Sequence, residues 1–258
     1  MATQSLANDA ASDIFAELDP HAIALLLDVD GTLIDIGPTP REVHVADDLR
    51  ASLQALSRAT DGALALVSGR PITDLDALFA PLKLPAVGGH GAELRRRGGE
   101  AVRAAAPLSP DLRRHLAAAA TPGSGIIVED KGYSLALHYR QAPQHEERVR
   151  SHIAAGRAAY PGEATEVLPG KAMLEVKRPE VNKGDGVGEL MRRPPFAGRR
   201  PVFIGDDVTD DSVFALLEEW GGLGFSVGRN FSGLAGMFNS PLDVRRALQR
   251  LAAKARAS

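Results

Sequence analysis

The sequence predicts an α/β protein in which a Rossmann-like, doubly wound parallel sheet is interrupted by a smaller α+β domain. Short apolar runs alternate with amphipathic segments in the first hundred residues. Hairpin patterns replace this alternation over residues 108–177, and the alternation then resumes. Strands that alternate with helices are typical of a parallel sheet, because each crossover needs a helix. We therefore expect a core of residues 1–107 and 178–258 and an inserted domain of residues 108–177.

The first half of the predicted sheet begins with the apolar run Ala22–Leu27, which has the character of a strand buried on both faces. Two more strands are predicted at Gly62–Val67 and Pro85–Gly88, and helices at Leu49–Thr60 and Ile72–Phe79 separate the three. A short helix before residue 20, a loop over residues 34–41 and a hairpin that turns at residues 97–99 complete this half.

Residues 108–177 follow the order helix, hairpin, helix, hairpin. Ser109 is placed to cap the first helix, and Pro110 suits its first position. The second helix is predicted at Glu146–Ala159. The hairpins are expected to turn at Lys131-Gly132 and at Pro169-Gly170-Lys171. Hairpins without a parallel crossover indicate a separate module.

After residue 181 the α/β pattern returns. Helices and strands are predicted in alternation at Gly184–Met191, Pro201–Ile204, Ser212–Glu219, Gly224–Val227 and Val244–Lys254. These segments supply the second half of the doubly wound sheet.

Composition restricts the possible partners of the chain. Its 258 residues have a net charge of −3, which gives no general attraction to nucleic acid or anionic membranes. No cysteine is present, so disulfides and thiolate metal sites are excluded. The sequence has neither a secretory signal pattern at its start nor an apolar run long enough to span a membrane. We expect a cytoplasmic monomer with no nucleic-acid or membrane partner.

Four polar sites stand where a predicted strand ends or a helix begins: the pair Asp28 and Asp30, Ser68, Lys183, and the pair Asp206 and Asp207. Residues two apart on a strand point the same way, so the first pair leaves its strand on one side. In a parallel sheet all four sites meet at the carboxyl edge, where ligands bind. Each site alone also has a structural explanation: an Asp-Gly turn, a helix cap, a surface lysine or an acidic loop.

Together, these residue types suit phosphoryl transfer. An aspartate can attack phosphorus to give an aspartyl-phosphate, which divides one difficult displacement into two easier steps. Mg²⁺ held by carboxylates neutralises phosphate charge, while a hydroxyl and an ammonium group bind the phosphate oxygens. The second aspartate of the first pair can protonate the leaving alkoxide and later take a proton from water. The P-loop signature is absent from the sequence.

These motifs resemble those of the haloacid dehalogenase-like (HAD) phosphohydrolases, which have a matching α/β fold. The motifs are DVDGT at residues 28–32, Ser68-Gly69-Arg70, Lys183 and GDDVTDD at residues 205–211. The resemblance implies that Asp28 is the nucleophile, Asp30 the general acid/base, and Ser68 and Lys183 phosphate ligands. It also implies Mg²⁺ as cofactor, bound by Asp28, Asp30, Asp206 and Asp207, with Asp30 using its backbone carbonyl.

Longer stretches resemble the trehalose-6-phosphate phosphatases: VEDKGYSLALHYR at residues 128–140 and GKAMLEVKRPEVNKG at residues 170–184. The resemblance implies a sugar-phosphate substrate, trehalose 6-phosphate, and an inserted cap domain that selects it. Asp211 departs from the family, where glutamate is commoner. The implied substrate-binding residues are Gly69, Arg70, His90, Glu129, Lys131, His138, Arg140, Lys171 and Glu175. The structural alternative is a charged outer sheet face for the cap residues and a loop histidine for His90, which is expected at the junction of the domains.

Three other functions stay open. A phosphomannomutase-like enzyme would return the phosphate to a sugar, but the cap motifs do not favour it. A related phosphatase could act on sucrose phosphate or mannosyl-phosphoglycerate. An inactive sugar-phosphate sensor is disfavoured because all four motif positions are filled.

Overall fold

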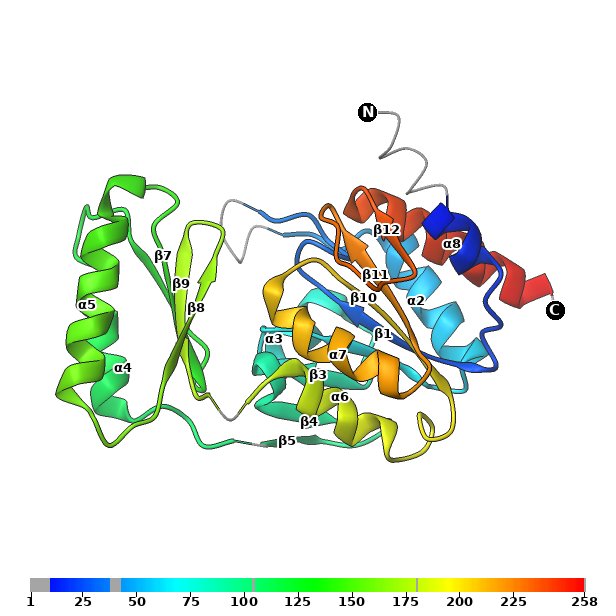
Figure 1. Cartoon of the computed structure of the whole chain (residues 1–258), viewed down its shortest axis with the longest axis horizontal. Helices are drawn as coiled ribbons and strands as arrows, with labels where there is room; N and C mark the ends of the chain where they lie inside the picture. Colours follow the sequence, from blue (N-terminus) through cyan, green and yellow to red (C-terminus); the bar gives the residue numbers. More distant parts are fainter. Residues whose placement is uncertain (1–9, 38–42, 104, 180, 258) are drawn as a thin grey trace. The chain divides into compact units, whose positions relative to one another are not determined.

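The computed structural model describes residues 10–37, 43–103, 105–179 and 181–257, and the chain divides into two compact units (Figure 1). The core unit comprises Met1–Val102 and Asn182–Ser258, and the inserted unit comprises Arg103–Val181. The boundaries expected from the sequence are 107/108 and 177/178. The predicted fold class, a mainly parallel α/β sheet with an inserted α+β unit, is confirmed.

The main sheet has the strand order β12-β11-β10-β1-β2-β3-β4-β5. Neighbours from β12 to β3 are parallel, and β4 is antiparallel to β3. The strands are β1(Ile23–Asp28), β2(Leu64–Val67), β3(Ala86–Gly88), β4(Glu93–Arg95), β5(Ala101–Arg103), β10(Arg200–Gly205), β11(Leu223–Val227) and β12(Gly236–Phe238). Because the chain order reverses at β1, between β10 and β2, the carboxyl end of β1 is a topological switch point, the usual ligand site of such sheets.

Side chains of β1 alternate between two apolar cores, as the two-residue period of a strand requires. Leu25 and Leu27 pack with side chains of α2, α3 and α8, while Ala24 and Leu26 pack with those of α6 and α7. Helices therefore cover both faces of the sheet (Figure 1). Their bounds are α2(Asp47–Ala59), α3(Ile72–Phe79), α6(Lys183–Met191), α7(Asp211–Glu219) and α8(Pro241–Ala257).

The inserted unit has the predicted order of helices and hairpins. Its antiparallel sheet, in the order β6-β7-β9-β8, is covered on one face by α4 and α5. Leu135 and Leu137 of β7 pack there against Leu116 and Ile153 of the two helices. The predicted cap of α4 is present, because Ser109 Oγ accepts a hydrogen bond from Leu112 N at 3.2 Å. The bounds are α4(Pro110–Ala117), β6(Ile127–Asp130), β7(Ser134–His138), η2(Pro143–His145), α5(Glu146–Ala159), β8(Glu166–Gly170) and β9(Met173–Lys177).

Two details of the prediction are wrong. The second hairpin turns at residues 171–172, because Pro169 and Gly170 still pair with Leu174 and Met173. Strand β8 lies at the edge of its sheet, where proline costs no ladder hydrogen bond. The short strand β12, with a glycine among its three residues, was not predicted.

The amino-terminal segment joins the core from residue 10 onward. Residues 10–16 are helical, and the ring of Phe15 lies 5.6 Å from that of Phe225 and 6.0 Å from that of Phe238. The predicted loop over residues 34–41 lies partly outside the described residues. Within the ranges that the structure describes, no helix combines the length and apolar character needed to cross a membrane.

Candidate active site

Asp28, the last residue of β1, lies at the switch point with its side chain buried. Lys183, the first residue of α6, donates from Nζ to Asp28 Oδ1 at 2.6 Å and to Asp210 Oδ1 at 2.7 Å. The side chains of Lys183 and Asp210 are buried as well. A buried ammonium between two carboxylates offsets much of the desolvation cost of all three charges. Asp28 and Lys183 were predicted to meet here, whereas Asp210 was not predicted.

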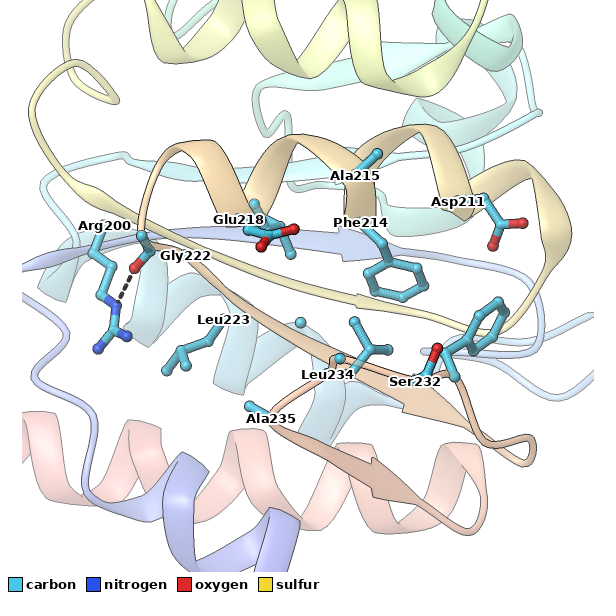
Figure 2. A pocket seen from close by; sticks show the side chains of 15 residues that line it. Arg200, Asp211, Phe214, Ala215, Glu218, Gly222, Leu223, Ser232, Leu234 and Ala235 are labelled. Carbon is cyan, nitrogen blue, oxygen red and sulfur yellow. Dashed lines mark hydrogen bonds between the residues drawn. The ribbon is translucent and has the colours of Figure 1, made fainter.

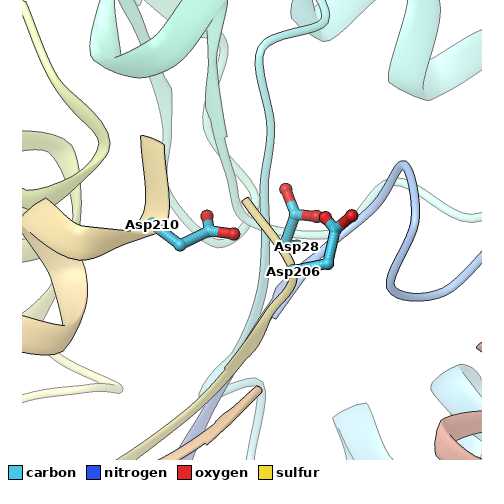
Figure 3. A group of neighbouring side chains, drawn as sticks. All are labelled: Asp28, Asp206 and Asp210. Atoms are coloured by element: carbon cyan, nitrogen blue, oxygen red, sulfur yellow. The ribbon is translucent and has the colours of Figure 1, made fainter. Parts of the chain in front are cut away.

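Asp206, which follows β10, completes a group of three carboxylates with Asp28 and Asp210 (Figure 3). One oxygen of each lies within 4.8 Å of the others. Gly31 fits closely beside this group: its φ is +83°, and a Cβ there would lie 2.2 Å from Asp206 Oδ2. Only glycine combines that conformation with so close an approach. Three hard oxygen donors at this spacing fit the preferences of Mg²⁺.

The surroundings of Asp28 raise its pKa well above the ordinary carboxyl value. Burial is the largest cause, Lys183 acts in the opposite direction, and the carboxylates of Asp210 and Asp206 raise the pKa further. Burial lowers the pKa of Lys183, but Asp210 and Asp28 outweigh burial and hold it above its ordinary value. The lysine therefore stays charged, and a further cation between the carboxylates would favour the ionised form of Asp28.

The carboxylates of Asp30 and Asp207, the other two predicted metal ligands, have different partners. Asp30 accepts two hydrogen bonds from Arg70, at 2.7 Å from Nε and 2.6 Å from Nη2. Asp207 Oδ1 accepts a bond of 2.7 Å from Val208 N, and Asp207 N donates to Asp210 Oδ2 at 3.0 Å. This reciprocal cap begins the short helix η3(Val208–Asp210). The structure thus brings Asp210, not Asp207, into the three-carboxylate group.

Ser68 follows β2, with its side chain buried. Its Oγ accepts a hydrogen bond of 3.1 Å from Arg70 N, which is a local capping role. His90 lies in η1(Gly89–Gly91), and its backbone N–H donates to the backbone oxygen of Ser68 at 3.0 Å. The His90 ring covers Gly69, since a Cβ on Gly69 would lie 2.3 Å from His90 Nε2. Ser68, Gly69 and His90 therefore form one packed group in the core unit.

Most polar residues predicted for the inserted domain lie on the sheet face opposite its helices. Lys131 Nζ donates to both carboxylate oxygens of Glu175 at 3.1 Å. His138 Nε2 lies 3.0 Å from Glu129 Oε2. Burial alone would raise the pKa of Glu129, but the hydrogen bond with His138 and the charge of Lys131 hold it below its ordinary value. The face thus presents two charge-assisted pairs with defined orientation.

Arg140 and Lys171 lie outside this regular face. Strand β7 ends at His138, so Arg140 lies beyond the strand. Arg140 Nη2 donates instead to the backbone oxygen of Lys171 at 3.3 Å. Lys171 belongs to the turn between β8 and β9.

A separate hollow of about 710 Å³ lies beside α7 in the core unit (Figure 2). Phe214 and Phe231, whose ring centroids are 5.3 Å apart, line it, and Arg200 Nε closes one side with a 2.7 Å bond to Gly221 O. None of the predicted site residues lines this hollow. Its walls bring together no group of carboxylates and lysine like that around Asp28, so the switch point is the stronger candidate site.

Gly91 packs closely against the backbone of the residue that precedes α6. Its φ is +109°, and a Cβ there would lie 2.1 Å from the backbone oxygen of Asn182, whose side chain caps α6. We expect Gly91→Ala to lower the free energy of unfolding by about 2–5 kcal/mol, because backbone strain and overpacking add. Gly98→Ala is a matched control, since Gly98 also has a positive φ but open space around it. Urea unfolding measures both, and equal losses would contradict the expectation.

Comparison with known proteins identifies similar sequences and folds. Residues 26–232 match the sequence profile of the family described as trehalose-phosphatase. A Sinorhizobium fredii protein named "Probable trehalose-phosphate phosphatase" is 40% identical over 227 residues, which are 87% of this chain and 84% of the relative. The Escherichia coli (strain K12) trehalose-6-phosphate phosphatase is 40% identical over 207 residues, 80% of this chain and 77% of the relative. The fold matches the C-terminal domain of C. albicans trehalose-6-phosphate phosphatase with a TM-score of 0.78 at 23% identity, covering 94% of this chain and 96% of that one.

Proposed function

Because this chain belongs to the trehalose-phosphatase family, we propose that it hydrolyses trehalose 6-phosphate to trehalose and phosphate, the last step of trehalose biosynthesis. The observation that carries the proposal is the buried group at the switch point, where Asp28 contacts Lys183 beside two more carboxylates. Such a group can accept a phosphoryl group and pass it to water. We further propose that the protein acts as a cytoplasmic monomer without nucleic-acid or membrane partners.

The reaction has two displacements at phosphorus. The Asp28 carboxylate attacks in line, the bond to the sugar oxygen breaks, and Asp30 gives a proton to that oxygen. Water then attacks the aspartyl-phosphate, Asp30 takes the proton, and phosphate leaves. Lys183 and the Ser68 hydroxyl bind the phosphate oxygens and offset their charge.

The carboxylates of Asp28, Asp206 and Asp210 would hold Mg²⁺, with the backbone carbonyl of Asp30 as the further ligand that the family resemblance implies. Bound there, Mg²⁺ supplies positive charge that neutralises the phosphate and orients it. The fit rests on three oxygen donors within 4.8 Å of one another. The raised pKa of Asp28 supports it, because an added cation would restore the ionised nucleophile.

The polar face of the inserted unit is proposed to bind the sugar. A disaccharide presents many hydroxyls, and donors and acceptors that are already paired and oriented lose little freedom when they bind it. The proposed sugar-binding residues of this unit are Glu129, Lys131, His138, Arg140, Lys171 and Glu175. In the core unit, Gly69 and His90 are proposed to contact the substrate beside the phosphate.

Phosphate release from a panel of sugar phosphates tests this function. With Mg²⁺ we expect strong release from trehalose 6-phosphate, little from glucose 6-phosphate, and none in EDTA. Preference for sucrose phosphate or mannosyl-phosphoglycerate would keep the chemistry and replace the substrate. An isomerised sugar phosphate without free phosphate would indicate a mutase, and no reaction at all would indicate a sensor.

A further inference from the structure

The guanidinium of Arg70 holds the carboxylate of Asp30 at two points. The two nitrogen–oxygen distances are 2.7 and 2.6 Å, one to each carboxylate oxygen. The guanidinium fork and the carboxylate are both planar, so two parallel bonds fix the position of the carboxylate and also its rotation. The side chain of Arg70 is only 11% exposed, whereas that of Asp30 is 37% exposed. The arginine is therefore the more firmly embedded partner.

The backbone on either side of Arg70 is itself held in place. Arg70 N donates to Ser68 Oγ at 3.1 Å, and Arg70 O accepts a bond of 2.9 Å from Gly89 N. Two residues later, Ile72 N donates to Glu93 Oε2 at 2.6 Å, which ties the start of α3 to β4. All of these contacts lie within the core unit. The guanidinium is therefore attached to a backbone segment that three hydrogen bonds hold in place.

We propose that Arg70 is a positioning residue, which holds the Asp30 carboxylate in the orientation that proton transfer needs. The proposal rests on the proposed role of Asp30 as general acid/base. Asp30 lies beyond the end of β1 and is more than a third exposed, so nothing in the strand fixes its side-chain rotation. An oriented catalytic group is far more effective than one that rotates. Arginine stays protonated throughout the working pH range, so Arg70 cannot itself take up the proton that Asp30 transfers.

This proposal assigns Arg70 a role that differs from the substrate contact predicted for it. A substrate ligand would act mainly on KM, whereas a residue that acts through Asp30 acts on kcat. Loss of orientation at a proton-transfer group costs on the order of 10²-fold. We therefore expect Arg70→Ala to lower kcat by about 10- to 100-fold and to change KM by less than about threefold.

A double-mutant cycle with Arg70→Ala and Asp30→Asn tests the proposal. Phosphate release is measured with Mg²⁺ on trehalose 6-phosphate and on p-nitrophenyl phosphate. If only p-nitrophenyl phosphate is hydrolysed, the proposed sugar substrate is wrong, but the roles of Arg70 and Asp30 are still tested. We expect Arg70→Ala to cost less than about threefold once Asp30→Asn is present, because the two residues act as one unit. Full additivity of the two losses, or a loss confined to KM, would overturn the proposal.

Two further variants separate positioning from folding and from charge. Arg70→Lys keeps the charge but not the fork, so we expect kcat to stay at least about 10-fold below the parent value. Full recovery by lysine would show that charge alone matters and would overturn the proposal. Arg95→Lys is the matched control, because Arg95 makes a similar buried contact of 2.7 Å with Asp76 away from the site. It should lower thermal stability and leave kcat within about threefold of the parent.

Discussion

Asp28→Asn should abolish phosphate release from every substrate, with kcat at least about 10³-fold below the parent value, the scale seen when a nucleophile is removed from a group that acts as a unit. An amide cannot attack phosphorus to form the acyl phosphate that water later hydrolyses. Lys183 keeps Asp210 as a partner in this variant, so we expect the protein to stay folded. Phosphate release at saturating substrate measures the loss, and thermal unfolding checks the fold.

Asp30→Asn is the informative comparison for that variant, because it leaves the nucleophile in place. With p-nitrophenyl phosphate, whose leaving group needs no proton, the first step should proceed and the second should slow by about 10²- to 10⁴-fold. A covalent phosphoryl adduct should then accumulate and appear in intact-protein mass spectrometry. The same adduct on Asp28→Asn would show that another residue attacks phosphorus and would contradict the assignment.

Much of the fold is predictable because strand burial and helix ends leave local signals. The continuous apolar run before Asp28 reflects a strand covered on both faces, and Ser109 and Pro110 mark a helix start in the sequence itself. Strand β12 and the turn after β8 leave no comparable signal. Their positions depend on which neighbouring strand they pair with, and strand pairing is a property of the folded sheet.

The residues of the candidate site also differ in whether the sequence predicts their positions. Asp28 and Lys183 could be placed together because both follow from the topology of a parallel sheet. The choice between Asp207 and Asp210 could not be made from an acidic run, since it depends on a short 3₁₀ turn that directs one carboxylate inward and uses the other as a cap. The contact of Arg70 with Asp30 likewise depends on the direction of a loop.

Asp210→Asn should remove about half or more of the stabilisation of the protein by Mg²⁺. A ligand at about 100 times its Kd raises the free energy of unfolding by about 2.7 kcal/mol. For a chain of this size, that raises Tm by several degrees. Loss of one carboxylate from a group of three weakens the attraction for a divalent cation, and we expect at least about 10-fold weaker binding. Thermal unfolding with and without Mg²⁺ measures this without any need for activity. Asp207→Asn is the matched control, because an amide oxygen can still cap η3, and it should keep the parental Mg²⁺ effect.

The same measurement has an expected pH dependence. In the metal-free protein the pKa of Asp28 is raised, so its contribution to stability is complete below the ordinary carboxyl pKa of about 4 and is lost as the pH rises through the raised value. Mg²⁺ binds the ionised carboxylates, and its stabilising effect should therefore grow over the same interval. We expect a larger increase in Tm near neutral pH than in mildly acidic buffer for the parent and for Asp207→Asn. A Mg²⁺ effect that survives in Asp210→Asn but disappears in Asp207→Asn would place the ion beside Asp207 instead.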